Sequence, residues 1–137
     1  MPPCCPTWDE YLCTYLLNPA YKCVPTLKGA AILGCDEILA EHNTCATYEE
    51  MSYILRGMCD PCCCPFKDGI RFGGKLYQFL SGDSNIVRAK TRDKCEGLIV
   101  VRATYLTLFG IYQDPVSVGE VAYVLEKQAD YLKRSGL

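Results

Sequence analysis

The sequence predicts an α+β domain: one antiparallel sheet of about six or seven strands, covered by helices on both faces. Three observations predict this class. Strand-like runs in the middle of the chain are joined by short connections. Three capping-box motifs mark helix starts. The stretch 98–101 is apolar on both faces. Short connections favour antiparallel pairing, because a parallel crossover needs about a dozen residues. We therefore expect the first and last helices together on one face and a shorter helix on the other.

The size and charge of the chain narrow the functional classes. Its 137 residues predict a single domain, 1–137, and its net charge of −2 argues against a general nucleic-acid binder. The start has no signal-peptide pattern, and no apolar run reaches the roughly 18 residues of a membrane span, so we expect a cytoplasmic protein. Since the eleven cysteines are odd in number, we expect mostly reduced thiols.

Three capping-box motifs of the form Thr/Ser-x-x-Glu predict the helix starts, because the two side chains cap each other's backbone N–H groups. They occupy 7–10, 47–50 and 117–120. Apolar residues at helical spacing follow each motif. The first helix is expected to end at Asn18-Pro19, the second near Asp60-Pro61, and the third just before Gly136 as a C-cap.

The strands are predicted between these helices. Stretches 30–34 and 38–40 read as one hairpin, and 69–72 and 75–80 read as a second. Gly73-Gly74 supplies the positive φ angles that a two-residue hairpin turn requires. Three more strands are expected at 86–90, 98–102 and 105–112.

This order of elements resembles that of the profilin family, and several short sequence motifs agree with the resemblance. The motifs are Trp8-Asp9-Glu10-Tyr11, then 31–34, 69–77, 87–90, 109–116, 130–132 and the ending Gly136-Leu137, the last part being closest to plant-type profilins. The resemblance covers nearly the whole chain and is weakest over 40–68. It implies a monomeric binding module of the actin cytoskeleton, not an enzyme and without a cofactor. The implied partners are monomeric actin, proline-rich peptides of actin regulators and phosphoinositide lipids.

Trp8 and Tyr11 are candidates for a site that binds proline-rich peptides. A polyproline II helix offers unpaired carbonyls, and Trp and Tyr provide both a flat wall and a donor. The two residues are three apart and share a helix face. Aromatic residues at this spacing are more often core, so the assignment depends on the resemblance. The resemblance implies the set Trp8, Tyr11, Leu39, Tyr131, Leu132 and Leu137. Leu39 departs from the family's usual tryptophan, and we expect weaker or altered proline binding.

The resemblance also implies an actin-binding face on the last helix and the neighbouring strands. Its members are Phe72, Gln78, Ser81, Arg88, Lys90, Val116, Gly119, Ala122, Tyr123, Glu126 and Lys127. Arg88 and Lys90 alternate so as to point from one strand face, and they would attract acidic actin. The alternative is an ordinary solvated strand face. Tyr123 stands where a basic residue is common, and Ala122 where a polar one is common, so the face is expected to be less cationic.

Two other features are weaker candidates. The basic residues Arg88, Lys90, Arg92, Lys94 and Arg102 would form the phosphoinositide patch. The cysteines of 59–64 contain C-x-x-C, which would require His42 or Cys45 nearby to complete a zinc site. Flanking prolines disfavour a redox motif, and an irregular loop is the simpler interpretation. A metal-binding or redox protein, and a profilin-fold adaptor that has lost one binding activity, remain as alternatives.

Overall fold

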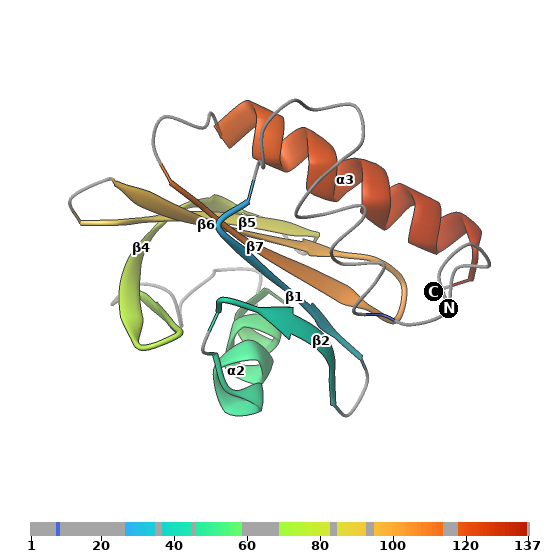
Figure 1. Ribbon diagram of the computed structural model, residues 1–137, viewed down its shortest axis with the longest axis horizontal. Coiled ribbons are helices and arrows are strands. Elements are labelled where there is room, and N and C mark those ends of the chain that lie inside the picture. Colours follow the sequence, from blue (N-terminus) through green and yellow to red (C-terminus); the bar gives the residue numbers. More distant parts are fainter. Residues whose placement is uncertain are drawn as a thin grey trace.

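A computed structural model of the chain describes residue 8 and the ranges 27–34, 37–44, 46–58, 69–82, 85–92, 95–113 and 118–136. Seven antiparallel strands form one curved sheet in the order β2-β1-β7-β6-β5-β4-β3 (Figure 1). The strands are β1 Gly29–Leu33, β2 Ile38–His42, β3 Ile70–Phe72, β4 Lys75–Gly82, β5 Ile86–Thr91, β6 Glu96–Arg102 and β7 Thr107–Gln113. The predicted α+β class is confirmed.

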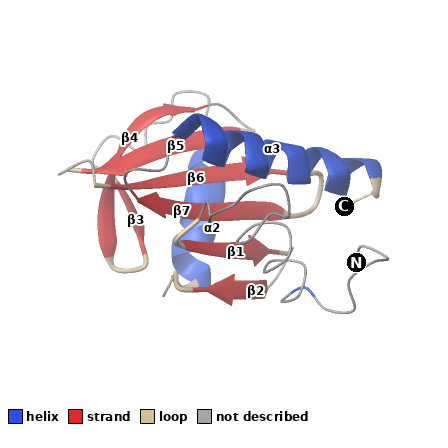
Figure 2. Cartoon of the chain, turned by 45° about the horizontal axis from the view of Figure 1, so that its top comes forward, coloured by secondary structure: helices blue, strands red, loops and turns tan. Residues whose placement is uncertain are grey.

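The two described helices lie on opposite faces of the sheet (Figure 2). Helix α3, Val118–Arg134, packs on β6 and β7. Helix α2, Tyr48–Met58, covers the other face near β3. Each face has its own buried cluster, which contains Ile99 and Leu125 on the α3 side, and Val100 and Met51 on the α2 side. We call these two clusters the α3-side core and the α2-side core.

The predicted turn at Gly73-Gly74 is confirmed. Both glycines have positive φ angles, 62° and 80°, and they connect β3 to β4 directly. This mirror-image turn matches the twist of the flanking strands, so it fixes their register.

The capping box of α2 is also confirmed. Thr47 N–H donates to Glu50 Oε1 at 3.2 Å, and Glu50 N–H donates to Thr47 Oγ1 at 3.2 Å. Glu50 Oε1 also accepts the N–H of Gly73 at 3.1 Å, so the same carboxylate connects the helix start to the β3–β4 turn. At the end of α3, Gly136 has a φ of 83° and its N–H donates to the carbonyl of Lys133, as expected for a C-cap.

Two predicted strand starts differ from the structure by two residues. Strand β6 begins at Glu96 instead of residue 98, because the Glu96 carboxylate is buried and paired with two lysines and so can lie within the sheet. Strand β7 begins at Thr107 instead of residue 105. The N–H of Ala103 donates to the carbonyl of Leu106 at 2.8 Å, which closes a tight turn and leaves Tyr105 exposed at its tip.

The first predicted helix lies outside the described residues, apart from Trp8, which is helical and packs against the α3-side core. Ser117, the first residue of the third capping motif, also lies outside them, whereas α3 begins at Val118. Among the described helices, none is both long and apolar enough to cross a bilayer.

Candidate protein-binding surface

Four predicted actin-face residues meet on adjacent strands. Val87 and Ala89 point into the α2-side core, so Arg88 and Lys90 of β5 lie half-buried on the α3 side of the sheet. In the strand register, Gln78 of β4 pairs with Lys90 and Ser81 pairs with Arg88. Both β4 residues are exposed. The result is a polar and basic strip on β4 and β5, beyond the strands on which α3 packs.

Lys90 is supported by an aromatic ring from two strands away. Lys90 pairs with Gly97, which pairs with Tyr112. The Tyr112 ring lies directly on Gly97, since a Cβ added there would be 2.1 Å from its Cζ. Lys90 Nζ lies 5.9 Å from the centroid of that ring. The absence of a side chain at residue 97 therefore lets a buried tyrosine reach the lysine.

Helix α3 adds an exposed stripe beside this strip. Gly119, Tyr123, Glu126 and Lys127 are exposed at helical spacing. Tyr123 is 55% exposed, and Lys127 Nζ lies 5.8 Å from the centroid of its ring. Ala122 instead belongs to the α3-side core. Val116 lies outside the described residues.

Phe72 is not brought to this surface. It is 1% exposed in the α2-side core, on the opposite side of the sheet from Lys90. Its ring stacks on Phe109 with 5.4 Å between centroids. The side chain offers a partner almost no area, whereas the family resemblance had implied that it belonged with the other candidates.

Four members of the predicted proline-peptide site lie in or against one core. Trp8, Leu39 and Tyr131 are all partly buried and pack against the α3-side core. Leu132 is completely buried in that core. Tyr11 and Leu137 lie outside the described residues.

The basic residues of the predicted phosphoinositide patch are spread along the sheet. Lys90 pairs with Gly97 near the start of β6, and Arg92 follows the end of β5 at the same end of the strand pair. Arg102 is at the other end of β6, beside Glu126 and Asp130 of α3. Lys94 lies outside the described residues. Arg102 therefore does not join Arg88 and Lys90 in one patch.

The cysteine cluster 59–64 and Cys45 also lie outside the described residues, while His42 is exposed at the end of β2. In the ranges that the structure describes, no three His, Cys, Asp or Glu side chains are grouped to hold a metal ion. Cys95 is exposed.

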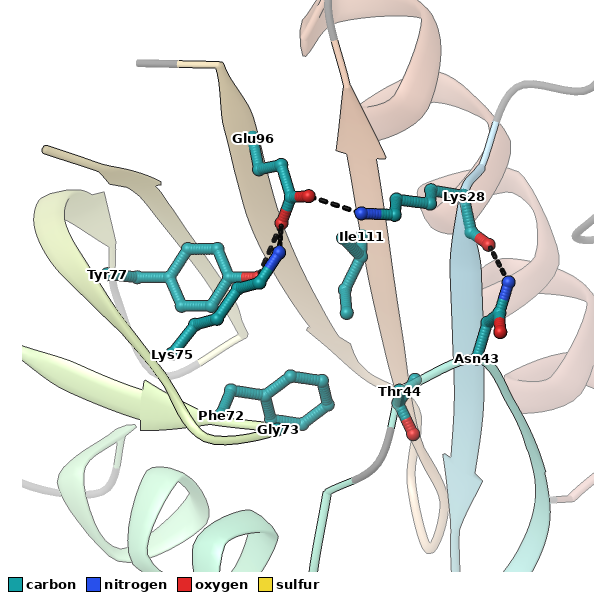
Figure 3. A pocket seen from close by; sticks show the side chains of 9 residues that line it. All are labelled: Lys28, Asn43, Thr44, Phe72, Gly73, Lys75, Tyr77, Glu96 and Ile111. Carbon is teal, nitrogen blue, oxygen red and sulfur yellow. Dashed lines mark hydrogen bonds and ion pairs between the residues drawn. The ribbon is translucent and has the colours of Figure 1, made fainter. Parts of the chain in front are cut away.

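An ion cluster on the α2 side of the sheet was not predicted. The ammonium groups of Lys28 and Lys75 each bond one carboxylate oxygen of Glu96, the second at 2.7 Å (Figure 3). The hydroxyl of Tyr77 lies 3.4 Å from the same carboxylate. Burial and this carboxylate raise the pKa of Tyr77. No local pattern indicates the cluster, because its lysines are 68 and 21 residues away from Glu96.

Glu96 should make folding pH-dependent. Burial alone would raise its pKa, but hydrogen bonds and charge from the two lysines outweigh burial and lower the pKa. The stabilisation is therefore complete above the ordinary carboxyl pKa and is lost as the pH falls through the lower folded value. We expect Glu96→Gln to reduce the free energy of unfolding by about 2 kcal/mol at pH 7. Below about pH 4 the difference in free energy of unfolding between Glu96→Gln and the parent protein should narrow steadily.

Urea unfolding of both proteins at pH 7, 5, 4 and 3 measures this gap. The exposed Glu37→Gln is the matched control and should follow the parent protein at every pH. A gap that stays constant down to pH 3 would contradict an ionised Glu96 in the folded state.

The fold and surface define a class: a small α+β module whose sheet presents a polar and basic strip beside an exposed helix stripe. The family model described as Profilin matches residues 6–137. A profilin of Drosophila melanogaster is 33% identical over 132 residues, covering 95% of this chain and 98% of the relative. The crystal structure of Acanthamoeba castellanii profilin II matches with a TM-score of 0.83 at 25% identity, covering 96% of this chain and all of that one. The chain belongs to the profilin family.

Two more distant structures share the fold and contain partners. A mouse profilin IIa structure is a complex with a double repeat from the FH1 domain of mDia1 (TM-score 0.64, 23% identity, covering 82% of this chain and 90% of that one). A LokiProfilin2/rabbit actin complex matches with a TM-score of 0.63 at 10% identity, covering 80% of this chain and 86% of that one.

Proposed function

We propose that residues 1–137 form one monomeric binding domain that regulates actin polymerisation by binding actin monomers. The observation that carries the proposal is the strip formed by Gln78, Ser81, Arg88 and Lys90 next to the exposed stripe of α3. A rigid sheet with rim cations suits a large acidic partner. Membership of the profilin family and the actin complex of a fold relative support the same assignment.

A second site for proline-rich peptides is proposed around Trp8, Leu39 and Tyr131. All three are partly exposed and rest on the α3-side core, which gives a peptide rigid apolar walls. The complex of a fold relative with an FH1 double repeat supports this site. The indole that the family usually carries at residue 39 is absent, so we propose moderate affinity.

Arg88→Glu should weaken actin binding by at least tenfold at low ionic strength, because it reverses one of the two charges of the strip. The association rate should fall most, and added salt should reduce the difference. Binding kinetics with monomeric actin at two salt concentrations measure this. The matched control is Arg56→Glu on α2, an exposed arginine on the other side of the sheet. Equal losses in both variants would indicate a general charge effect and contradict the proposed surface.

Poly-L-proline should produce a saturable change in tryptophan fluorescence, because Trp8 is the only tryptophan in the chain. Tyr131→Ala should weaken this binding about tenfold by removing one wall. Tyr123→Ala is the matched control on the same helix, and it should weaken actin binding instead. A flat titration of folded protein would refute the proline site and would favour an adaptor that has lost one activity.

A further inference from the structure

A pocket of about 200 Å³ lies on the α2 side of the sheet. It opens between the end of β2, where Asn43 and Thr44 stand, and the β3–β4 turn at Gly73. Lys28, Lys75 and Glu96 line it from above in Figure 3, and the Phe72 ring lines it from below. The strip of Arg88 and Lys90 is on the opposite side of the sheet, so this pocket is separate from the proposed actin surface.

The charges in this pocket do not cancel. Two ammonium groups converge on the single carboxylate of Glu96, which leaves one excess positive charge among the lining residues. The Glu96 side chain is 8% exposed, while those of Lys28 and Lys75 are 38% and 51% exposed. The Glu96 carboxylate is therefore enclosed, and the ammonium groups of the two lysines face solvent. This arrangement attracts a second anion from solution.

A buried hydroxyl in the same pocket has no hydrogen-bond partner among the described residues. Thr44 is 3% exposed, and its Oγ1 has no hydrogen bond within the described part of the chain. A buried polar group without a partner is costly, and such groups in native proteins call for a specific explanation. A polar occupant of the pocket would provide one.

The rim of the pocket is held in place by local contacts. Asn43 adopts a left-handed φ of 60°, and its amide donates to the carbonyl of Lys28 at 3.4 Å. On the other rim, Gly73 N–H is held by Glu50, which does not line the pocket. Non-glycine residues in this backbone region concentrate at ligand sites and clamps. Both rims are therefore fixed before any ligand arrives.

We propose that this pocket binds a compact oxyanion, the carboxylate or phosphate head of a small molecule, between the ammonium groups of Lys28 and Lys75. The two lysines supply charge-assisted hydrogen bonds, and Glu96 holds them at the pocket mouth. Because Glu96 also competes with the ligand for both ammonium groups, it limits the affinity. Occupation is compatible with actin binding on the opposite side of the sheet.

Titration of ¹⁵N-labelled protein with inorganic phosphate, and separately with acetate, at pH 7 and constant ionic strength tests this. The Gly73 amide reports the pocket. We expect a saturable shift with at least one of the two anions, and the tighter one identifies the head group. Lys28→Met and Lys75→Met should each weaken binding at least fivefold, whereas Lys133→Met, an exposed lysine at the end of α3, should leave it unchanged.

Glu96→Gln separates a ligand site from a purely structural ion cluster. Removing the competing carboxylate should strengthen anion binding at least fivefold, even though the protein becomes less stable. Lys75→Arg keeps the charge and should retain affinity within twofold, which guards against a folding defect in the methionine variants. The proposal is overturned if neither anion gives a saturable shift of Gly73, or if Glu96→Gln fails to bind more tightly.

Discussion

Phe72→Ala should lower the free energy of unfolding by about 4 kcal/mol. Phe72 is 1% exposed and its ring stacks on Phe109, so truncation leaves a cavity beside the Phe109 ring in the α2-side core. Packed β-sheet neighbours cannot collapse to fill a void of that size. Chemical denaturation of the variant and its parent measures the loss.

Two controls separate the core role of Phe72 from a role in binding. Leu80→Ala removes an apolar side chain that is 56% exposed, and it should change stability by less than about 0.5 kcal/mol. Phe72→Leu keeps most of the volume, so the folded variant should bind actin within twofold of the parent. A large loss of actin affinity in folded Phe72→Leu would restore Phe72 to the actin surface.

Gly97→Ala should lower the free energy of unfolding by about 3 kcal/mol through overpacking. The added methyl would lie 2.1 Å from Cζ of Tyr112 and 2.3 Å from its Cε1, far inside contact distance. Tyr112 is only 2% exposed, so its ring cannot swing out without opening the α3-side core. If the ring is displaced, Lys90 loses its support, and actin binding should weaken in the folded fraction as well.

A double-mutant cycle tests whether the cost arises from this ring. Tyr112→Leu removes the ring that lies on residue 97. In that background the destabilisation caused by Gly97→Ala should be smaller by at least about 1 kcal/mol, which is about a third of its value in the parent protein. Gly119→Ala is the matched control, because nothing lies within 4 Å of the added methyl on α3. It should be neutral or stabilise the helix by up to about 1 kcal/mol. Additive losses in the cycle would mean that another contact limits residue 97.

Sequence patterns predicted the features that depend on neighbouring residues. The capping box of Thr47 and Glu50 satisfies backbone groups within one turn, and the Gly73-Gly74 turn follows from local φ requirements. The side-chain alternation of Arg88 and Lys90 follows from the two-residue period of a strand. Each can be read from a few consecutive residues, so the fold class and the strip on β5 were accessible from sequence.

Features that depend on contacts between residues far apart in the sequence could not be predicted from the sequence. The predicted strand began at residue 98, and the place of Glu96 in β6 depends on Lys28 and Lys75, which come from two other parts of the chain. Phe72 lies beside the candidate residues in sequence, yet the pleat of β3 turns it to the opposite side of the sheet from Lys90. The family resemblance implied which positions belong to the actin-binding face. It did not show whether each side chain is buried, because that depends on the face of the sheet from which the side chain projects.

The strand order has a consequence for how the protein is made. The hairpin of β1 and β2 joins the other strands only through β7, where Ala31 pairs with Phe109 across nearly 80 residues. A chain emerging from the ribosome can form that hairpin and the run β3 to β6 early, but it cannot join them until Gln113 has been synthesised. Closing so long a loop is slow, and both halves present unpaired edges in the meantime. Synthesis should therefore pass through a period in which the nascent chain depends on chaperones to avoid aggregation.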